Sequence, residues 1–220
     1  MSGRLIVLEG IDGSGKGTQA ERLVGRLRDA GRRVATLTFP QYEANRFGGM
    51  IGRFLNGEFG TLDAVPAELA ALLFAGDRLE SKPQLLRLLQ EHDDVVLDRY
   101  VASNVAHQAG RVSGPRRQSL VSFLDWLEHE LYGLPRPGLT FWLDLPVDVA
   151  AERIRRKTAR SYTDRASDIQ EENADHLTAA REVYAGLATA QAWHRVDTVP
   201  DGQALSAEEV TDRLVAVCET

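Results

Sequence analysis

One glycine-rich stretch, residues 10–18, carries the clearest chemistry in this sequence. It follows the apolar run 5–8, typical of a buried parallel strand, and precedes apolar residues at helical spacing that stop before Gly31. Glycines between a strand and a helix let backbone N–H groups turn around a phosphate, and Lys16 can neutralise the outer phosphates of a nucleoside triphosphate. A glycine-rich turn that binds nothing is the alternative. The predicted phosphate-binding residues are Gly10, Ile11, Asp12, Gly13, Ser14, Gly15, Lys16, Gly17 and Thr18.

The end of this loop departs from the usual Gly-Lys-Ser/Thr, in which the hydroxyl group binds Mg2+. Gly17 follows Lys16 directly, and Thr18 comes one residue later. A metal ion would therefore depend on water, on substrate phosphates and on acidic side chains, of which Asp12 and Asp98 are the candidates. The segment Gly-Ser-Gly-Lys-Gly-Thr-Gln resembles the loop of adenylate kinases and points to nucleoside monophosphate kinases in general.

A cluster of basic side chains near residue 156 is the second group suited to phosphoryl transfer. Such transfer mainly needs charge neutralisation and positioning, which arginines provide. We therefore favour a lid of arginines that closes over the transferring group, and the alternative is a solvated helix end, where cations are also stable. The cluster consists of Arg153, Arg155, Arg156, Lys157, Arg160 and Arg165.

Polar residues also gather after the third predicted strand. Asp98 stands at the carboxyl end of the strand, where phosphate-loop enzymes place an acidic residue near the metal, and Arg99 should face the phosphates. The following residues put polar side chains at helical spacing, which could read the edge of a base or could simply be exposed to solvent. These side chains are Ser103, Asn104, His107 and Gln108.

Four further residues are candidates for an acceptor pocket. Phe39 and Tyr42 flank the end of the second predicted strand, where open parallel sheets bind ligands; a core Phe39 and a surface Tyr42 fit the pattern equally well. Phe74 and Arg78 share a helix face that could stack on a base and bond its carbonyl edge, unless that face packs on another subunit. We expect this pair to lie opposite a buried stripe made of Leu69, Leu72, Leu73, Gly76 and Leu79.

Composition and element order indicate a single α/β domain. The chain has 220 residues, 43% of them hydrophobic, and apolar runs alternate with helical patterns. The net charge of −6 argues against nucleic-acid or membrane-surface partners, which need a basic footprint. One cysteine, no signal-peptide pattern and no apolar run of ~20 residues lead us to expect a cytoplasmic protein. The expected strands are 5–8, 33–39, 94–98, 139–145 and 193–197.

Taken together, these motifs resemble the thymidylate kinases, which phosphorylate dTMP to dTDP with MgATP. The resemblance runs from the first strand to about Tyr184 and implies a homodimer. It also implies the three-layer P-loop NTPase fold, with a five-stranded parallel sheet flanked by helices, one domain over 1–220 and an arginine-rich lid at about 156–168. The motifs that carry it are Phe39-Pro40, Phe74 with Arg78, Asp98-Arg99-Tyr100 with Ser103 and Asn104, and the basic cluster.

The resemblance also implies individual roles. Phe74 would stack on thymine, and Arg78 would bond its carbonyl edge. Gly13 and Ser14 stand where some members carry a basic catalytic residue, so a lid arginine is expected to act in catalysis. The implied catalytic residues are Lys16, Asp12 and Arg99 with Arg156, Arg160 and Arg165 as lid candidates. The implied dTMP-binding residues are Asp12, Phe39, Tyr42, Phe74, Arg78, Arg99, Ser103, Asn104, His107 and Gln108.

Two departures and two rival functions qualify this assignment. His107 stands where many bacterial members have a tyrosine beside the deoxyribose, and Ile169 stands where many have an arginine. Another nucleoside monophosphate kinase, such as an adenylate or UMP kinase, is the nearest rival, but the third strand ends Asp98-Arg99-Tyr100 rather than in the Asp-Gly-Phe-Pro-Arg of adenylate kinases. A non-catalytic nucleotide-binding module is the second rival, and the sequence has no Asn-Lys-x-Asp guanine signature.

Overall fold

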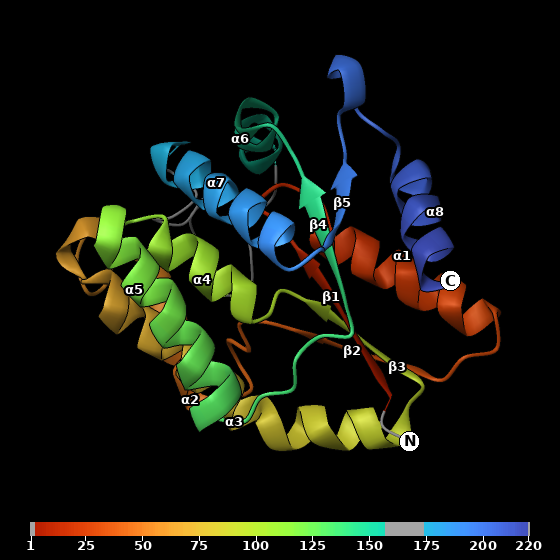
Figure 1. The fold of residues 1–220 in the computed structure, drawn as a ribbon, viewed down its shortest axis with the longest axis horizontal. Helices are drawn as coiled ribbons and strands as arrows, with labels where there is room; N and C mark the ends of the chain where they lie inside the picture. The colour runs from red at the N-terminus through yellow and green to blue at the C-terminus, as the bar shows by residue number, and fades with distance from the viewer. Residues whose placement is uncertain (1–2, 157–173, 220) are drawn as a thin grey trace.

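The centre of the molecule is a sheet of parallel strands in the order β2-β3-β1-β4-β5 (Figure 1). The structure is a computed structural model that describes residues 3–156 and 174–219. Within these ranges the strands are β1 (Arg4–Glu9), β2 (Val34–Thr38), β3 (Asp94–Asp98), β4 (Leu139–Asp144) and β5 (His194–Asp197). The predicted five-stranded parallel sheet is therefore confirmed, and its strands lie close to the expected bounds.

Helices cover both faces of the sheet and complete a three-layer arrangement. In Figure 1, α1 and α8 lie on one side of the strands, and α3, α4, α5 and α7 lie on the other. The helices are α1 (Lys16–Asp29), α2 (Arg46–Leu55), α3 (Ala67–Glu91), α4 (Val101–Ala109), α5 (Gly114–Asp125), α6 (Val147–Arg155), α7 (Ala174–Ala190) and α8 (Ala207–Cys218), with the short helices η1 (Leu62–Ala64), η2 (Trp126–Leu131) and η3 (Pro200–Gly202).

The apolar run of β1 explains why both faces need a cover. Side chains alternate along a strand, so Ile6 and Leu8 join the core under α1 and α8, whereas Leu5 and Val7 join the core under α4 and α7. All four are at most 3% exposed. A strand buried on both faces is the arrangement that a continuous apolar run predicts.

The predicted buried stripe of α3 is wrong for three of its four leucines, although Gly76 is buried and Leu73 packs, half-buried, against a small core cluster. Leu69, Leu72 and Leu79 are 56%, 37% and 40% exposed, whereas the buried side is built from alanines, among them Ala71 and Ala75. Periodicity locates an apolar stripe but not its partner, and small alanines let a helix pack closely against its neighbours. The buried alanines of α3 are Ala67, Ala70, Ala71 and Ala75. Phe74 and Arg78 therefore lie beside the buried side of α3 rather than opposite to it.

Candidate active site

The loop between β1 and α1 needs glycine at specific positions. Gly10, Gly13 and Gly15 have φ angles of 147°, 78° and 92°, which side chains rarely adopt. A Cβ at Gly10 would lie 2.6 Å from the carbonyl oxygen of Leu143, and one at Gly13 would lie 2.9 Å from that of Ala150. The glycines thus let the chain turn tightly into α1, whose N-terminus can face an anion.

Lys16 lies under this loop. Its Nζ donates to the carbonyl oxygens of Gly10 and Ile11, at 2.9 Å each, and the side chain is only 6% exposed. Burial, together with the nearby Arg99 cation, lowers the pKa of Lys16 to about 8. The ammonium group is therefore poorly compensated in the protein alone, and a bound polyphosphate would supply the missing negative charge.

Arg99 follows β3 and enters the same site from the other side. Its backbone has a φ of 69°, in the left-handed region, and its N–H donates to the carbonyl oxygen of Leu8 at 3.0 Å. The guanidinium forms an ion pair with Asp12, and its Nη1 donates to Ser103 Oγ at 3.2 Å. A non-glycine residue held in this conformation is costly and is typical of functional positions. Asp12 and Arg99 therefore join the two strand ends within one charged pair.

A cavity of about 380 Å3 lies between these elements. The ten predicted dTMP-binding residues all line it, and so do Lys16, Gly17, Thr18 and Asp98. Phe39 is also a core residue, 2% exposed, with its ring centroid 6.1 Å from that of Tyr100, so it belongs to the core and lines the cavity at the same time. Predicted loop and pocket residues far apart in the sequence therefore surround one space.

One end of the cavity holds a buried ion pair that the sequence did not reveal. Arg78 uses Nε and Nη2 to contact Glu128 of η2, and the two side chains are 2% and 0% exposed. Glu128 also accepts a hydrogen bond from Asn104 Nδ2 at 2.9 Å, and Asn104 Nδ2 donates to the carbonyl oxygen of Ala71 at 3.0 Å. Glu128 thus fixes both Arg78 and Asn104 with respect to the cavity.

The fixed amides leave two polar atoms for a ligand. The two partners of Asn104 Nδ2 are a carboxylate and a carbonyl oxygen, which can only accept, so the atom facing them must be the NH2 group of the amide. The amide oxygen Oδ1 is then a buried acceptor without a partner among the described residues. Gln108 Oε1 accepts from Arg111 Nη1 at 2.9 Å, and Gln108 Nε2 is a buried donor, likewise unpartnered within the described part of the chain. Because buried polar groups are normally satisfied, these atoms indicate a polar ligand in the cavity.

Glu9, at the end of β1, is a buried residue that sequence reasoning missed. Its carboxylate accepts from the backbone N–H groups of Tyr100 and Ser103, from Ser103 Oγ at 2.6 Å and from the Tyr184 hydroxyl at 3.0 Å. Burial raises the pKa of Glu9, although the Ser103 hydrogen bond opposes this shift. The one available signal was a glutamate that ends an otherwise apolar strand. Glu9 connects the phosphate loop with α4 and α7.

Asp98 fits the role of a Mg2+ ligand. Its Oδ1 is buried and has no hydrogen-bond partner among the described residues, and a Cβ at Gly17 would lie 3.2 Å from Oδ2. A carboxylate oxygen is a ligand that Mg2+ prefers, and the missing side chain of Gly17 leaves space beside it. No group of three or more His, Cys, Asp or Glu side chains gathers as a metal site among residues 3–156 and 174–219. An ion here would thus need substrate phosphates and water as further ligands.

These features can be compared with known proteins. The model of the thymidylate kinase family matches residues 8–208. The chain belongs to the thymidylate kinase family. The thymidylate kinase of Mycobacterium tuberculosis (strain ATCC 25618 / H37Rv) is 39% identical over 189 residues, which cover 86% of this chain and 87% of that relative. The human thymidylate kinase is 34% identical over 151 residues, covering 69% and 65%.

A solved structure of a family member supports the fold. The thymidylate kinase of Candida albicans matches with a TM-score of 0.74 and 25% identity, covering 99% of this chain and 92% of that one. The P-loop fold expected from the sequence is therefore confirmed. Membership of the thymidylate kinase family also favours the main interpretation over an adenylate or UMP kinase and over a non-catalytic module.

Of the three predicted lid arginines, only Arg156 lies among the described residues. Arg160 and Arg165 lie outside the described residues, as does most of the segment 156–168. Arg156, just beyond α6, is 77% exposed and pairs with Glu152, and it does not line the cavity. Arg153 does line it, and its Nη1 donates to the carbonyl oxygen of Gly13 at 3.3 Å. Arg153 belongs to the basic cluster of the sequence, but its place at the cavity could not be predicted from the pattern.

Proposed function

We propose that this protein transfers the γ-phosphoryl group of MgATP to dTMP, giving dTDP and ADP, with both nucleotides bound across the cavity described above. The main support is that one space is lined by the phosphate loop and by a matched pair of base-reading amides. The loop residues Gly10 to Thr18 hold the donor phosphates, and the residues from α3 and α4 hold the acceptor. The family match provides independent support for this reaction.

The choice of thymine rests on the polarity of the two unpartnered amide atoms. Thymine presents an N–H donor between two carbonyl acceptors. Asn104 Oδ1 is the acceptor for this N–H, and Gln108 Nε2 and Arg78 are donors for the carbonyls, with Phe74 against the ring. Cytosine would place a ring nitrogen acceptor opposite Asn104 Oδ1, which would leave two buried acceptors facing each other.

The transfer itself is direct and in line. A dTMP phosphate oxygen attacks the γ-phosphorus of ATP, and no general base is needed because that oxygen is already anionic. Lys16 and Arg99 spread the charge of the transferring group, and Arg99 also orients the acceptor phosphate. Asp98 would hold Mg2+, and the ion would supply neutralisation of the phosphate charge. Asp12 contributes by holding Arg99 in place, and a lid at about 156–168 would exclude water.

A comparison of acceptors tests the proposed function. We expect kcat/KM for dTMP to exceed that for dCMP by at least about a thousandfold, because a site built for hydrogen bonds rejects a base that leaves them unpaired. ADP release would be measured with MgATP and, separately, dTMP, dUMP, UMP, AMP, dCMP and thymidine. A preference for AMP, or no turnover with any acceptor, would refute the proposal.

The pKa of Lys16 predicts how ATP binding depends on pH. A triphosphate binds the protonated amine, so affinity is full below the pKa of about 8 and falls as the pH rises through it. We expect Kd for MgATP to rise about tenfold between pH 7 and pH 9. In the Lys16→Arg control the guanidinium does not titrate in this range, so its Kd should stay constant. Titration calorimetry at fixed ionic strength would measure both, and parallel pH profiles would contradict the assignment.

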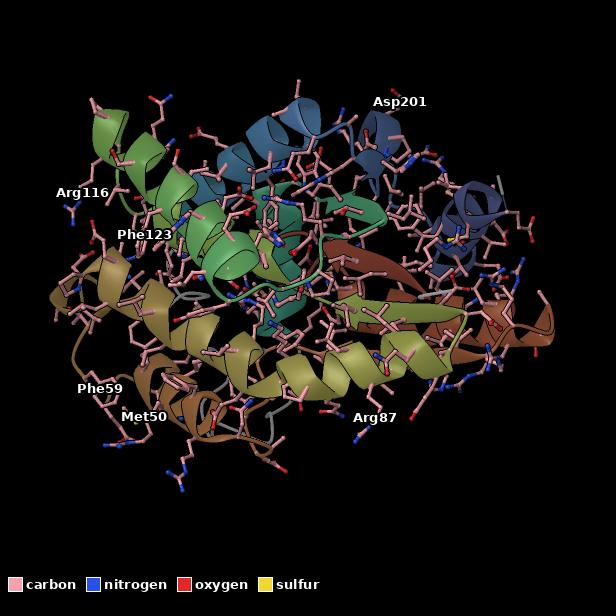
Figure 2. All side chains as sticks on the ribbon, turned by 60° about the horizontal axis from the view of Figure 1, so that its bottom comes forward. Met50, Phe59, Arg87, Arg116, Phe123 and Asp201 are labelled. Carbon is pink, nitrogen blue, oxygen red and sulfur yellow. The ribbon has the colours of Figure 1, made fainter. Side chains whose placement is uncertain are left out.

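We also propose that the protein is a homodimer joined through the exposed leucines of α3. In Figure 2, Phe123 lies on α5, on the side of the molecule where α2 and α3 also lie. Large exposed apolar residues are typical of an interface, and four of those among the described residues lie on α3. They are Leu69, Leu72, Leu79 and Leu86 on α3, Phe47 on α2, Phe123 on α5, and Trp126 and Leu131 on η2.

Light scattering during size exclusion would test the interface. Wild-type protein should have the mass of two chains, and Leu72→Glu or Leu79→Glu should give the mass of one, because a carboxylate would be buried at the interface. Arg213→Glu, a charge change on α8, across the sheet from α3, is the control and should stay dimeric (Figure 1). Monomeric wild-type protein would contradict the proposal.

Among the described residues no helix is long and apolar enough to cross a membrane. We propose that the enzyme works in the cytoplasm.

A further inference from the structure

Two histidines from different helices meet beside the acceptor end of the cavity. His107 belongs to α4 and lines the cavity, whereas His176 belongs to the first turn of α7 and does not. His107 Nδ1 lies 3.2 Å from His176 Nε2, the ring centroids are 5.3 Å apart, and each residue is 5% exposed. The ring of Tyr184 packs edge-on against His107 at 6.3 Å. None of the roles assigned so far requires His176.

The neighbouring arginine decides where the protons lie. Arg99 Nη1 is 3.4 Å from His107 Nε2, at the long end of the hydrogen-bond range. A guanidinium can only donate, so Nε2 of His107 must accept, and the neutral ring then carries its proton on Nδ1. That proton points at His176 Nε2, which must in turn accept. The two contacts therefore form one directed chain, from Arg99 through His107 to His176.

The surrounding charges keep this chain neutral. Burial lowers the pKa of His107 well below its ordinary value, and the nearby Arg99 and Lys16 cations act in the same direction while Asp12 opposes them. Burial lowers the pKa of His176 to about 4, with Arg111 acting in the same direction and Asp12 and Asp63 opposing. Tyr184, whose ring packs against His107, has a pKa raised well above its ordinary value by burial and stays uncharged. Neutral rings are the state in which Nε2 of His107 can accept from Arg99.

We propose that His176 is a positioning residue: by accepting from His107 Nδ1 it keeps Nε2 of His107 facing Arg99, and so helps to aim the Arg99 guanidinium at the acceptor phosphate. The inference rests on the proposed role of Arg99 in holding dTMP. Arg99 contacts Asp12, Ser103, His107 and the carbonyl oxygen of Gly10, and the His107 contact depends on which nitrogen of the imidazole carries the proton. His176 stabilises the tautomer that Arg99 requires, and it does so from a different helix.

Kinetics of two substitutions would test this role. His176→Leu removes the acceptor at similar size, and we expect KM for dTMP to rise about tenfold, the value of one hydrogen bond to a charged group, with KM for ATP unchanged. His176→Gln keeps an acceptor and should restore most of the affinity for dTMP. Equal KM values for dTMP in the wild type and His176→Leu would overturn the proposal, and so would equal losses in both variants.

Nitrogen NMR of the wild-type protein gives a test that does not depend on any variant folding. We expect the 15N shifts of His107 to show a protonated Nδ1 and a bare Nε2 from pH 6 to 8. A protonated Nε2, or a doubly protonated ring at pH 6, would overturn the proposal.

Arg99→Ala separates this inference from the proposed function. If Arg99→Ala leaves KM for dTMP unchanged, the assignment of Arg99 to the acceptor phosphate fails. If Arg99→Ala raises KM for dTMP and His176→Leu does not, the inference alone is refuted.

Discussion

Replacing Lys16 with alanine is expected to lower kcat by at least about a thousandfold while the protein stays folded. The ammonium group is the cation closest to the turn of the phosphate loop, and phosphoryl transfer depends on cations that are already in position. Its hydrogen bonds to the described residues are with the loop, at Gly10, Ile11 and Ser14. Removing a buried, poorly compensated cation should therefore not lower stability.

The measurement combines an ADP-release assay with thermal unfolding of the same samples. The expected pattern is lost turnover at an unchanged or slightly higher Tm. A variant that turns over at a near-normal rate would show that Lys16 is not part of the transfer. A large fall in Tm would mean that the contacts of Lys16 with the loop hold the fold, and that its role in catalysis must be tested by Lys16→Met instead.

Replacing Glu128 with leucine should be the most destabilising single change in the site. Arg78 would then carry an uncompensated charge at 2% exposure, and breaking a buried pair in this way costs about 3–5 kcal/mol of unfolding free energy. The double variant Arg78→Met/Glu128→Leu removes both charges. We expect it to regain most of the stability, because a buried pair replaced by apolar residues of similar volume is often neutral.

The affinity for dTMP should not recover in the double variant as the stability does, and this difference separates the effect on stability from the effect on function. Both variants should bind dTMP at least about tenfold more weakly, because the base loses the Arg78 donor or its fixed position. Urea denaturation and titration calorimetry would measure the two quantities. A double variant that binds dTMP normally would refute the assignment of Arg78 to the base. A double variant no more stable than Glu128→Leu would refute the cost ascribed to the unpaired arginine.

The features that local sequence determines could be predicted. The strands follow from apolar runs, because parallel strands covered on both faces need them. The phosphate loop follows from glycines whose φ angles side chains avoid. The sequence also located the polar face of α4, whose Ser103, Asn104, His107 and Gln108 all line the cavity. These residues are close in sequence, so helical spacing alone brings them together.

The features that depend on distant partners could not be predicted. Glu128 pairs with Arg78 across 50 residues, and Glu9 pairs with Tyr184 across 175. His176 is equally remote from His107, 69 residues away. The leucines of α3 show a further limit: periodicity marks them as a stripe, but an outward stripe that suits a second subunit has the same pattern as one that faces the core. Only the packing of the alanines shows which side is inside.

The most direct test of direct transfer between two nucleotides in one cavity is a single-turnover experiment. Enzyme in excess would be mixed with Mg2+ and [γ-32P]ATP in the presence and absence of dTMP, and the label would be followed in dTDP, in inorganic phosphate and on the protein. We predict that the label passes to dTDP without a labelled protein intermediate, and that little phosphate is released without dTMP. Label on the protein, or release of phosphate in place of dTDP, would contradict it.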